Sequence, residues 1–207
     1  MSTPDKSIDP KLLESARKEF SKCGFLNASL KNICDNAGIT TGALYKRYKG
    51  KHELFCAVVE PTITQLTGFV AARSAEDLEA MSDAELSGVW EMNEAAMLKT
   101  FRLIWDHRKG FVLLLNKSAG TRYENFHHDF VEMMSKTYVQ SYTETRKRGL
   151  ASEELTEREL HVLCSSFWTS VYEPFTHSMT WAEIENHCRS LCKFFDWAKV
   201  IGLKQKG

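Results

Sequence analysis

Apolar residues recur at intervals of three and four positions along almost the whole chain. No segment shows the sustained alternation of apolar and polar residues that is typical of strands. Four prolines occur in 207 residues, and Pro61 is expected to bend or split the helix that contains it. The pattern therefore predicts an all-α protein, with helices at residues 10–23, 29–37, 40–48, 52–73, 83–107, 108–118, 123–148, 156–178 and 180–200.

The first two predicted helices carry start and stop signals. Asp9 and Pro10 suit the cap and the first turn of the first helix, and Gly24 suits its C-terminal end. Ser29 can cap the second helix because its hydroxyl can accept a hydrogen bond from a free backbone N–H group. Gly38 closes that helix. Short turns therefore separate the helices at this end of the chain.

The second and third predicted helices meet through residues 37–40, in the form of a helix-turn-helix. Gly38 gives the tight turn its backbone freedom, and Thr40 or Thr41 can cap the third helix. Such a helix can enter the major groove of DNA, where its first residues reach base edges. Its predicted outward face consists of Thr41, Gly42, Ala43, Tyr45, Lys46 and Arg47.

Positive charge is concentrated near the N-terminus of a chain whose formal net charge is zero. Residues 1–51 hold ten Lys/Arg and five Asp/Glu, whereas the remaining residues hold 17 and 22. This asymmetry favours an anionic partner for the N-terminal part, although a solvated charged surface would give the same count. Phosphate contacts are expected on both flanks of the third helix. The predicted DNA-binding residues are Ser29, Lys31, Thr40, Thr41, Gly42, Ala43, Tyr45, Lys46, Arg47, Lys49 and Lys51.

The stretch from Lys11 to Val59 resembles the DNA-binding domain of TetR-family transcriptional regulators. The matching residues are Ala16, Phe20, Gly24-Phe25, Ser29-Leu30, Ile33, Ala37-Gly38-Ile39, the run from Gly42 to Lys51, and Glu53-Leu54. The resemblance implies a helix-turn-helix DNA-binding domain at residues 1–54 and a helical effector-binding and dimerisation domain at residues 55–207. It also implies a ligand-responsive repressor that binds a palindromic operator as a homodimer, with phosphate contacts at the positions of Tyr45 and Lys51.

The second domain is expected to form the dimer and to hold a small-molecule effector of unknown identity. By resemblance, the last two long helices pair with those of the partner. The candidates for this contact are the apolar stripes Leu160, Leu163, Phe167, Val171 and Phe175, and Ile184, Cys188, Leu191, Phe195 and Ala198. Some members of both stripes must face the subunit's own core. Each candidate pocket residue, taken singly, is more readily explained by core packing. The candidates are Trp90, Met97, Phe101, Trp105, Phe126, Phe130, Met134, Phe167, Trp168 and Tyr172.

Several classes of protein are disfavoured by signals that the sequence lacks. The first residues have no apolar segment of a secretory signal, and no uninterrupted apolar run has the length of a membrane helix. Six cysteines without CxxC spacing are expected to be reduced thiols. We therefore predict a cytoplasmic protein without cofactor or metal.

Two alternative functions stay open. One is a helical sensor that binds a small molecule or a protein but no longer binds DNA specifically. The other is an enzyme that uses Cys164 with His161, which lie three residues apart on one predicted helix. No oxyanion site, glycine-rich phosphate loop or carboxylate pair accompanies these two residues, so we do not expect an enzyme.

Overall fold

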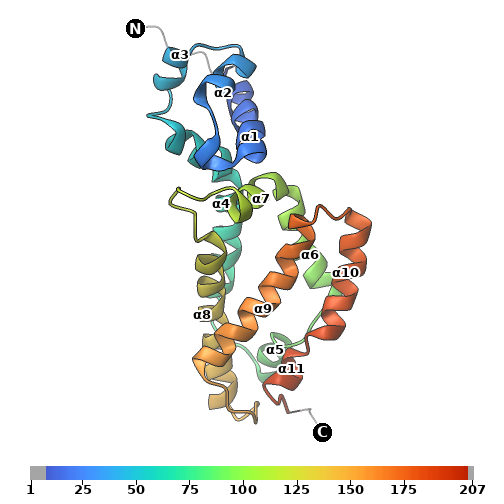
Figure 1. Ribbon diagram of the computed structural model, residues 1–207. Coiled ribbons are helices and arrows are strands. Elements are labelled where there is room, and N and C mark those ends of the chain that lie inside the picture. The colour runs from blue at the N-terminus through green and yellow to red at the C-terminus, as the bar shows by residue number, and fades with distance from the viewer. Residues whose placement is uncertain (1–7, 205–207) are drawn as a thin grey trace. The chain divides into compact units, whose positions relative to one another are not determined.

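The computed structural model describes residues 8–204, and in this part of the chain the regular structure is helical (Figure 1). One isolated bridge joins Ala151 to Leu203. The chain divides into two compact units. The head unit runs up to Leu66 and includes His107–His127, and the body unit consists of Thr67–Asp106 and the chain from His128 onward. The all-α prediction is confirmed.

The head unit contains three short N-terminal helices, the first part of a long helix, and one helix from the middle of the chain. Their bounds are α1 (Ile8–Asn27), α2 (Leu30–Ala37), α3 (Thr41–Tyr45), α4 (Lys51–Ser74) and α7 (Arg108–Asn116). Gly24 has a non-helical backbone with φ of 74° and breaks α1 near its end, at the position expected to terminate the helix.

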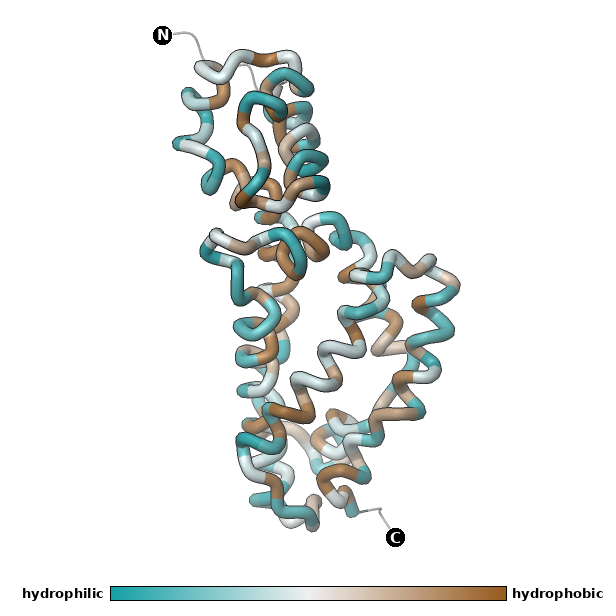
Figure 2. Tube along the Cα trace, in the orientation of Figure 1, coloured by the Kyte–Doolittle hydropathy of each residue, from teal (hydrophilic) through white to brown (hydrophobic). Residues whose placement is uncertain are grey.

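The body unit contains the end of α4 and most of the later helices. Along α9 and α10, apolar positions recur at helical intervals between polar ones (Figure 2). The bounds of the later helices are α5 (Asp83–Gly88), α6 (Glu94–Asp106), α8 (Phe126–Lys147), α9 (Glu157–Thr176), α10 (Trp181–Phe194) and α11 (Trp197–Val200).

Two predicted helices are each divided in two. The expected helix at 83–107 is interrupted because Trp90 turns into the core, where its Nε1 donates to Thr145 Oγ1 at 2.9 Å. Asn93 then starts α6 by accepting a hydrogen bond from the Ala96 N–H. The expected helix at 180–200 is divided before Asp196, which caps α11. By contrast, α4 continues through Pro61 as one helix, so the alternative of a split there is wrong.

The core of the head unit is built around three phenylalanine rings. Phe20 of α1 is fully buried and meets Phe55 of α4 edge to face, with ring centroids 5.0 Å apart. Phe25 completes the group, at 6.2 Å from Phe20 and 5.6 Å from Phe55. These contacts hold α1 against α4 and so provide the support on which the helix-turn-helix rests.

Helix α7 approaches α4 closely because Gly110 has no side chain. A Cβ atom added at Gly110 would overlap Thr62 Oγ1 and would lie 3.1 Å from Thr62 Cβ. Thr62 is itself buried, and its hydroxyl donates to the His107 carbonyl at 3.4 Å. The pair sets the separation of the two helices within the head unit.

Helix α4 is apolar enough, by length and composition, to cross a membrane. Its most apolar window has a mean hydropathy of 1.4, and 33% of that window is buried. The search for uninterrupted apolar runs did not single out this helix as a membrane candidate, because Thr62, Thr64 and Gln65 interrupt its apolar residues. The helix contributes to both units, with Phe55 in the core of the head unit and Val70 in the core of the body unit. A helix that lies in a protein core can meet the same criteria of length and hydropathy as a membrane helix.

The compact units do not follow the predicted boundary at residue 54. Leu54 and Phe55 are both buried in the head unit, and α4 remains in that unit as far as Leu66. Helix α7, which belongs to the predicted effector domain of residues 55–207, also packs in the head unit. The division into a DNA-binding part and an effector-binding part at residue 54 stays a prediction.

Most of the apolar residues proposed for the dimer contact are buried inside the single chain. These are Leu160, Phe167, Val171 and Phe175 on α9, and Ile184, Cys188 and Leu191 on α10. They pack in the body unit, for example where Phe101 stacks on Phe175 with centroids 6.3 Å apart. Helical spacing marks a buried face but does not show whether the same chain or a partner buries it. These seven residues are therefore the members of the two stripes that face the subunit's own core, and Leu163, Phe195 and Ala198 remain candidates for the dimer contact.

Candidate nucleic-acid interface

The turn between α2 and α3 has the geometry that its residues predict. Gly38 lies in the left-handed region with φ of 69°, and its N–H bonds to the Asp35 and Cys34 carbonyls at the end of α2. Thr40 then caps α3, because its hydroxyl accepts a hydrogen bond from the Ala43 N–H at 3.2 Å. The chain therefore reverses within a few residues and presents the start of α3 to solvent.

Helix α2 is fixed to α1 by polar contacts. The half-buried Ser29 caps α2, and its backbone N–H donates to Glu19 Oε1 at 3.1 Å. The same carboxylate oxygen accepts from Asn32 Nδ2, and Ser15 Oγ donates to the Ile33 carbonyl at 2.8 Å. Ser29 thus has a defined structural role, and its predicted contact with DNA comes in addition to that role.

One side of α3 faces the core and the opposite side faces solvent. Leu44 is fully buried, whereas the Tyr45 side chain is 57% exposed. Thr40, Thr41, Gly42 and Lys46 are also exposed, and Ala43 is half-buried. On this surface the tyrosine hydroxyl, the threonine hydroxyls and one ammonium group surround a stretch of backbone without large side chains.

Arg47 does not project outward as expected. Its Nε donates to the Asp9 carboxylate at 2.7 Å, its Nη1 donates to the Ala43 carbonyl, and its side chain is 10% exposed. Asp9 lies in the first turn of α1, which begins at Ile8, and it binds Arg47 just beyond the end of α3, so its expected role as the cap of α1 is wrong. Tyr48 lies nearby, and its pKa is raised, first by burial and then by the Asp9 carboxylate. Arg47 is better explained as a link between α1 and α3 than as a residue that contacts bases.

Lys51 is also engaged within the head unit. Its ammonium donates to the Leu26 carbonyl at 2.8 Å and to the Ala28 carbonyl at 3.1 Å, and it lies 4.9 Å from the centre of the Phe25 ring. A cation at these carbonyls stabilises the C-terminal end of α1. One N–H of the ammonium is left over for a phosphate, so the predicted contact is compatible with this geometry.

The remaining predicted cations, Lys31 and Lys49, are exposed. The backbone N–H of Lys49 donates to Glu53 Oε2 at 2.6 Å, just before the start of α4. Together with Tyr45 and Lys46, they place polar and positive groups on α2, on α3 and just before α4. The exposed predicted residues therefore all lie between the start of α2 and the start of α4.

Comparison with known proteins agrees with this geometry. The family model described as "Bacterial regulatory proteins, tetR family" matches residues 12–58. The chain carries a TetR-family DNA-binding domain. The HTH-type transcriptional regulator UidR of Escherichia coli (strain K12) is 36% identical over 59 residues, which are 28% of this chain and 30% of the relative. The match thus spans less than a third of that relative's length.

Two longer comparisons cover most of this chain. The HTH-type transcriptional repressor KstR2 of Mycolicibacterium smegmatis is 24% identical over 155 residues, which are 72% of this chain and 70% of the relative. The crystal structure of native NalD from Pseudomonas aeruginosa, described as the secondary repressor of the MexAB-OprM multidrug efflux pump, has a TM-score of 0.60. It covers 98% of this chain and 99% of its own at 16% identity, so it establishes likeness of fold.

Sequence reasoning missed a second set of contacts in the head unit. The segment after α7 packs on α1 and α4, where the Phe25 N–H donates to the Lys117 carbonyl at 2.9 Å. The Arg122 N–H donates to His52 Nε2 at 3.3 Å. Nothing in the local sequence announces these bonds, because each joins segments about 70 residues or more apart. They make α7 and its following loop part of the head.

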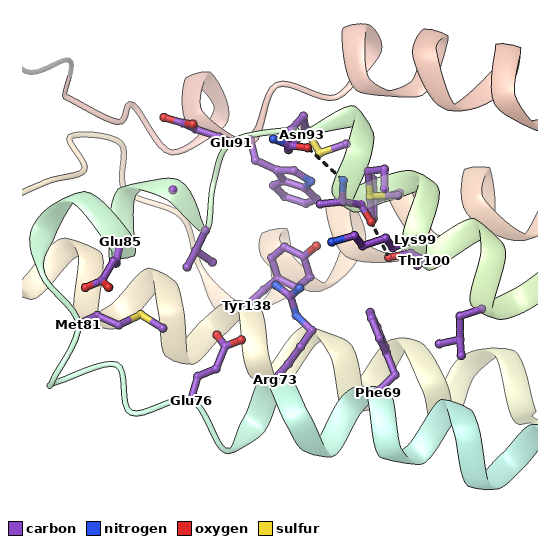
Figure 3. A pocket seen from close by; sticks show the side chains of 18 residues that line it. Phe69, Arg73, Glu76, Met81, Glu85, Glu91, Asn93, Lys99, Thr100 and Tyr138 are labelled. Carbon is purple, nitrogen blue, oxygen red and sulfur yellow. Dashed lines mark hydrogen bonds between the residues drawn. The ribbon is translucent and has the colours of Figure 1, made fainter.

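The predicted effector-binding residues occupy different places. A cavity of about 590 Å³ lies in the body unit, and among the ten candidates only Met97 and Phe167 line it (Figure 3). Trp105 is half-buried against Trp181. Phe126 packs on Phe111 in the head unit. The other candidates are buried core residues, namely Trp90, Phe101, Phe130, Met134, Trp168 and Tyr172.

The structure does not support a Cys164–His161 nucleophile pair. His161 Nδ1 lies 3.2 Å from Ser135 Oγ and 3.6 Å from the Glu132 carboxylate. Cys164 is fully buried, and its burial raises the pKa of the thiol to about 12. A nucleophilic cysteine must be an accessible thiolate, whereas this thiol is protonated and enclosed.

Proposed function

We propose that this chain is a sequence-specific transcriptional regulator, a repressor that binds a palindromic operator as a homodimer and responds to a small molecule in the cytoplasm. The observation that carries the proposal is the exposed surface of α3 on a matched TetR-family head. Leu44 fixes the inner side of the helix, while Tyr45 and Lys46 remain available outside. A helix held in this way by its neighbours can be inserted into the major groove as a rigid body.

Fewer side chains project outward to contact bases than the sequence suggested. With Arg47 held by Asp9, the long outward side chains of α3 are Tyr45 and Lys46. Gly42 and Ala43 let the backbone approach the bases closely, and the Ala43 methyl group suits a thymine methyl. Lys31, Lys49 and the remaining N–H of Lys51 would hold the phosphates on either side.

Lys46→Ala is expected to weaken binding to DNA that flanks the protein's own gene. It should also reduce the slope of log affinity against log salt concentration by about 1 for each subunit, and so by about 2 for the homodimer, because each subunit loses one cation from its contact with DNA. Fluorescence anisotropy across a salt series measures both quantities. Lys46 suits this test better than Arg47 or Lys51, since the side chains of those two residues hold the head together.

Lys136→Ala is the matched control for Lys46→Ala. Lys136 is 70% exposed on α8 in the body unit, so its loss changes net charge equally without altering the head. Its affinity and salt slope should equal those of the wild type. Equal slopes for all three proteins, with no preference over random DNA, would contradict the proposal. They would favour a helical sensor that no longer binds DNA specifically.

The outward sides of α9 and α10 are the proposed dimer contact. Val162 is 58% exposed on α9, and Phe194 at the end of α10 is 81% exposed. Also on α9, the hydroxyls of Ser166 and Ser170 donate to carbonyls of their own helix, so these small side chains need no further hydrogen-bond partner. The two helices are tied together where His187 Nε2 meets the Ser170 carbonyl at 2.7 Å. Such a surface permits close approach of a second pair of helices.

Phe194→Asp is expected to raise the dimer dissociation constant about thirtyfold or more, since a central aromatic contact is typically worth about 2 kcal/mol. Sedimentation velocity at several protein concentrations measures the constant. Phe194→Leu retains apolar area and should remain largely dimeric. A dimer of unchanged strength in Phe194→Asp would place the contact elsewhere on the chain.

Ligand response requires that the body unit influence the head. The chain crosses from one unit to the other within α4 after Leu66, between Asp106 and His107, and after His127. At the second crossing α6 leads directly into α7, which packs on α4 through Gly110 and Thr62. A ligand that favours one arrangement of α6 would thus bias the position of α7, and through it the head.

A further inference from the structure

Two residues that line the body-unit cavity carry buried hydrogen-bond donors without a partner. The Nε atoms of Arg73 and Trp197 are both shielded from solvent, and neither has a hydrogen-bond partner among the described residues. Arg73 lies in the last turn of α4 and Trp197 starts α11, so two separate elements bring these groups to one cavity. A buried donor without an acceptor is costly, and few occur in native proteins without a reason.

Other groups of the cavity are also donors. Figure 3 shows the Arg73 guanidinium directed toward Tyr138 of α8 and the Lys99 ammonium of α6 directed into the same space. The guanidinium carbon lies 5.9 Å from the centre of the Tyr138 ring. Burial raises the pKa of Tyr138 to about 12, so its hydroxyl keeps its proton at neutral pH. The polar part of the lining therefore presents N–H and O–H groups, and two of its side chains, Arg73 and Lys99, are cations.

The acidic residues of the cavity wall do not cancel this character. Glu76, Glu85 and Glu91 are all exposed. The Glu85 carboxylate accepts bonds from the Ser82 N–H and hydroxyl at 2.8 and 2.7 Å. Glu76 stands one turn after Arg73, yet no ion pair between the two is found within residues 8–204. These carboxylates, like Lys99, are thus exposed to solvent, whereas Arg73 is half-buried.

The remaining walls are apolar. Phe69, Met97, Leu103 and Phe167 line the cavity beside the donors. A volume of about 590 Å³ lies in the range of cavities that enclose small organic ligands. Such a combination suits a molecule with one anionic, acceptor-rich end and an apolar body, because an arginine fork and an indole N–H both pair with a carboxylate.

We propose that the effector is an organic carboxylate, whose anionic group binds Arg73 and Trp197 and whose apolar body lies against Phe69, Met97 and Phe167. This inference rests on the proposed ligand-responsive function and adds the chemical class of the ligand. Lys99 would add a further positive charge at the anionic end. The bound carboxylate would join α4, α6 and α11 within the body unit.

The test uses full-length protein and three pairs of probes, each pair being an acid and its primary amide. The acids are octanoate, 4-phenylbutyrate and naphthalene-1-acetate, and the amides keep their shape without the charge. Isothermal titration calorimetry should show at least one acid binding ten times or more tightly than its amide. In Arg73→Met the affinity for that acid should fall tenfold or more, while affinity for the amide changes less than twofold.

Two further variants separate recognition from folding. Trp197→Phe removes the indole donor but keeps an aromatic ring, and should weaken acid binding severalfold. Lys136→Gln, remote from the cavity lining, should leave it unchanged. Thermal unfolding of each variant shows whether the fold is intact, and Arg73→Gln, which also removes the charge, replaces Arg73→Met if the latter does not fold.

The proposal is overturned if acids and amides bind alike, if no acid binds at millimolar concentration, or if the preference for acids survives Arg73→Met. DNA binding is measured separately by anisotropy. Acid binding without any DNA binding would refute the proposed regulator but keep this site. Specific DNA binding without acid binding would refute the carboxylate site but keep the proposed regulator.

Discussion

Phe20→Ala is expected to lower the free energy of unfolding of the head unit by about 3–5 kcal/mol and to abolish DNA binding at ordinary temperature. The side chain is fully buried and its ring contacts both Phe25 and Phe55. Its removal leaves a cavity between α1 and α4, and α3 loses the support that orients it. Urea unfolding followed by far-UV circular dichroism measures the loss of helix.

The tryptophans allow the two units to be followed separately in this experiment. All five lie in the body unit, at residues 90, 105, 168, 181 and 197, so their fluorescence reports on that unit alone. Phe20→Ala should shift the dichroism transition and leave the fluorescence transition nearly in place. Tyr45→Ala, at a 57% exposed side chain, should weaken DNA binding without shifting either transition. A stability loss below about 1 kcal/mol for Phe20→Ala would mean that the ring is not central to the core.

Gly110→Ala is expected to destabilise the protein by about 1–3 kcal/mol, although alanine is the better helix former. The added methyl group would overlap Thr62 Oγ1, and the Thr62 Cβ lies too close for rotation of the hydroxyl to relieve the contact fully. Rotation would also cost the bond from Thr62 to the His107 carbonyl. Urea unfolding gives the change in free energy.

Gly68→Ala is the control for Gly110→Ala. It makes the same chemical change within α4, where an added Cβ meets nothing within 4 Å, and it should stabilise the protein by about 0.5–1 kcal/mol. In a double-mutant cycle, Thr62→Ala should relieve much of the cost of Gly110→Ala, so the two changes should not be additive. Additive effects would show that Thr62 and Gly110 do not limit the approach of the helices.

The head was the most predictable part of the molecule because its signals are local. Gly38 and Thr40 each act on the backbone of neighbouring residues, so their roles as helix terminator and cap follow from their side chains alone. Asn93 and Asp196 also act locally, because each caps the helix that follows it. These two capping residues could have predicted from the sequence that the two long helices are divided.

The parts that were not predictable depend on contacts between distant segments. Arg47 was placed outward because of its position on the helix, yet Asp9, 38 residues earlier, holds it. Helical spacing identified the buried sides of α9 and α10 but not what covers them. The cavity was sought among aromatic residues because they are large, whereas its polar lining came from Arg73 and Trp197, which share no sequence motif.

Four of the five indole groups of the body unit fall into two classes, and this gives the protein built-in spectroscopic reporters. Trp90 and Trp181 donate to Thr145 and Glu185, at 2.9 and 2.7 Å, whereas the indole nitrogens of Trp168 and Trp197 are buried without a partner in the described chain. In a nitrogen-15 spectrum, an indole proton moves downfield when it gains a hydrogen bond. The Trp197 signal would therefore report directly on an acceptor in the cavity, with the Trp90 signal as an internal reference recorded in the same sample.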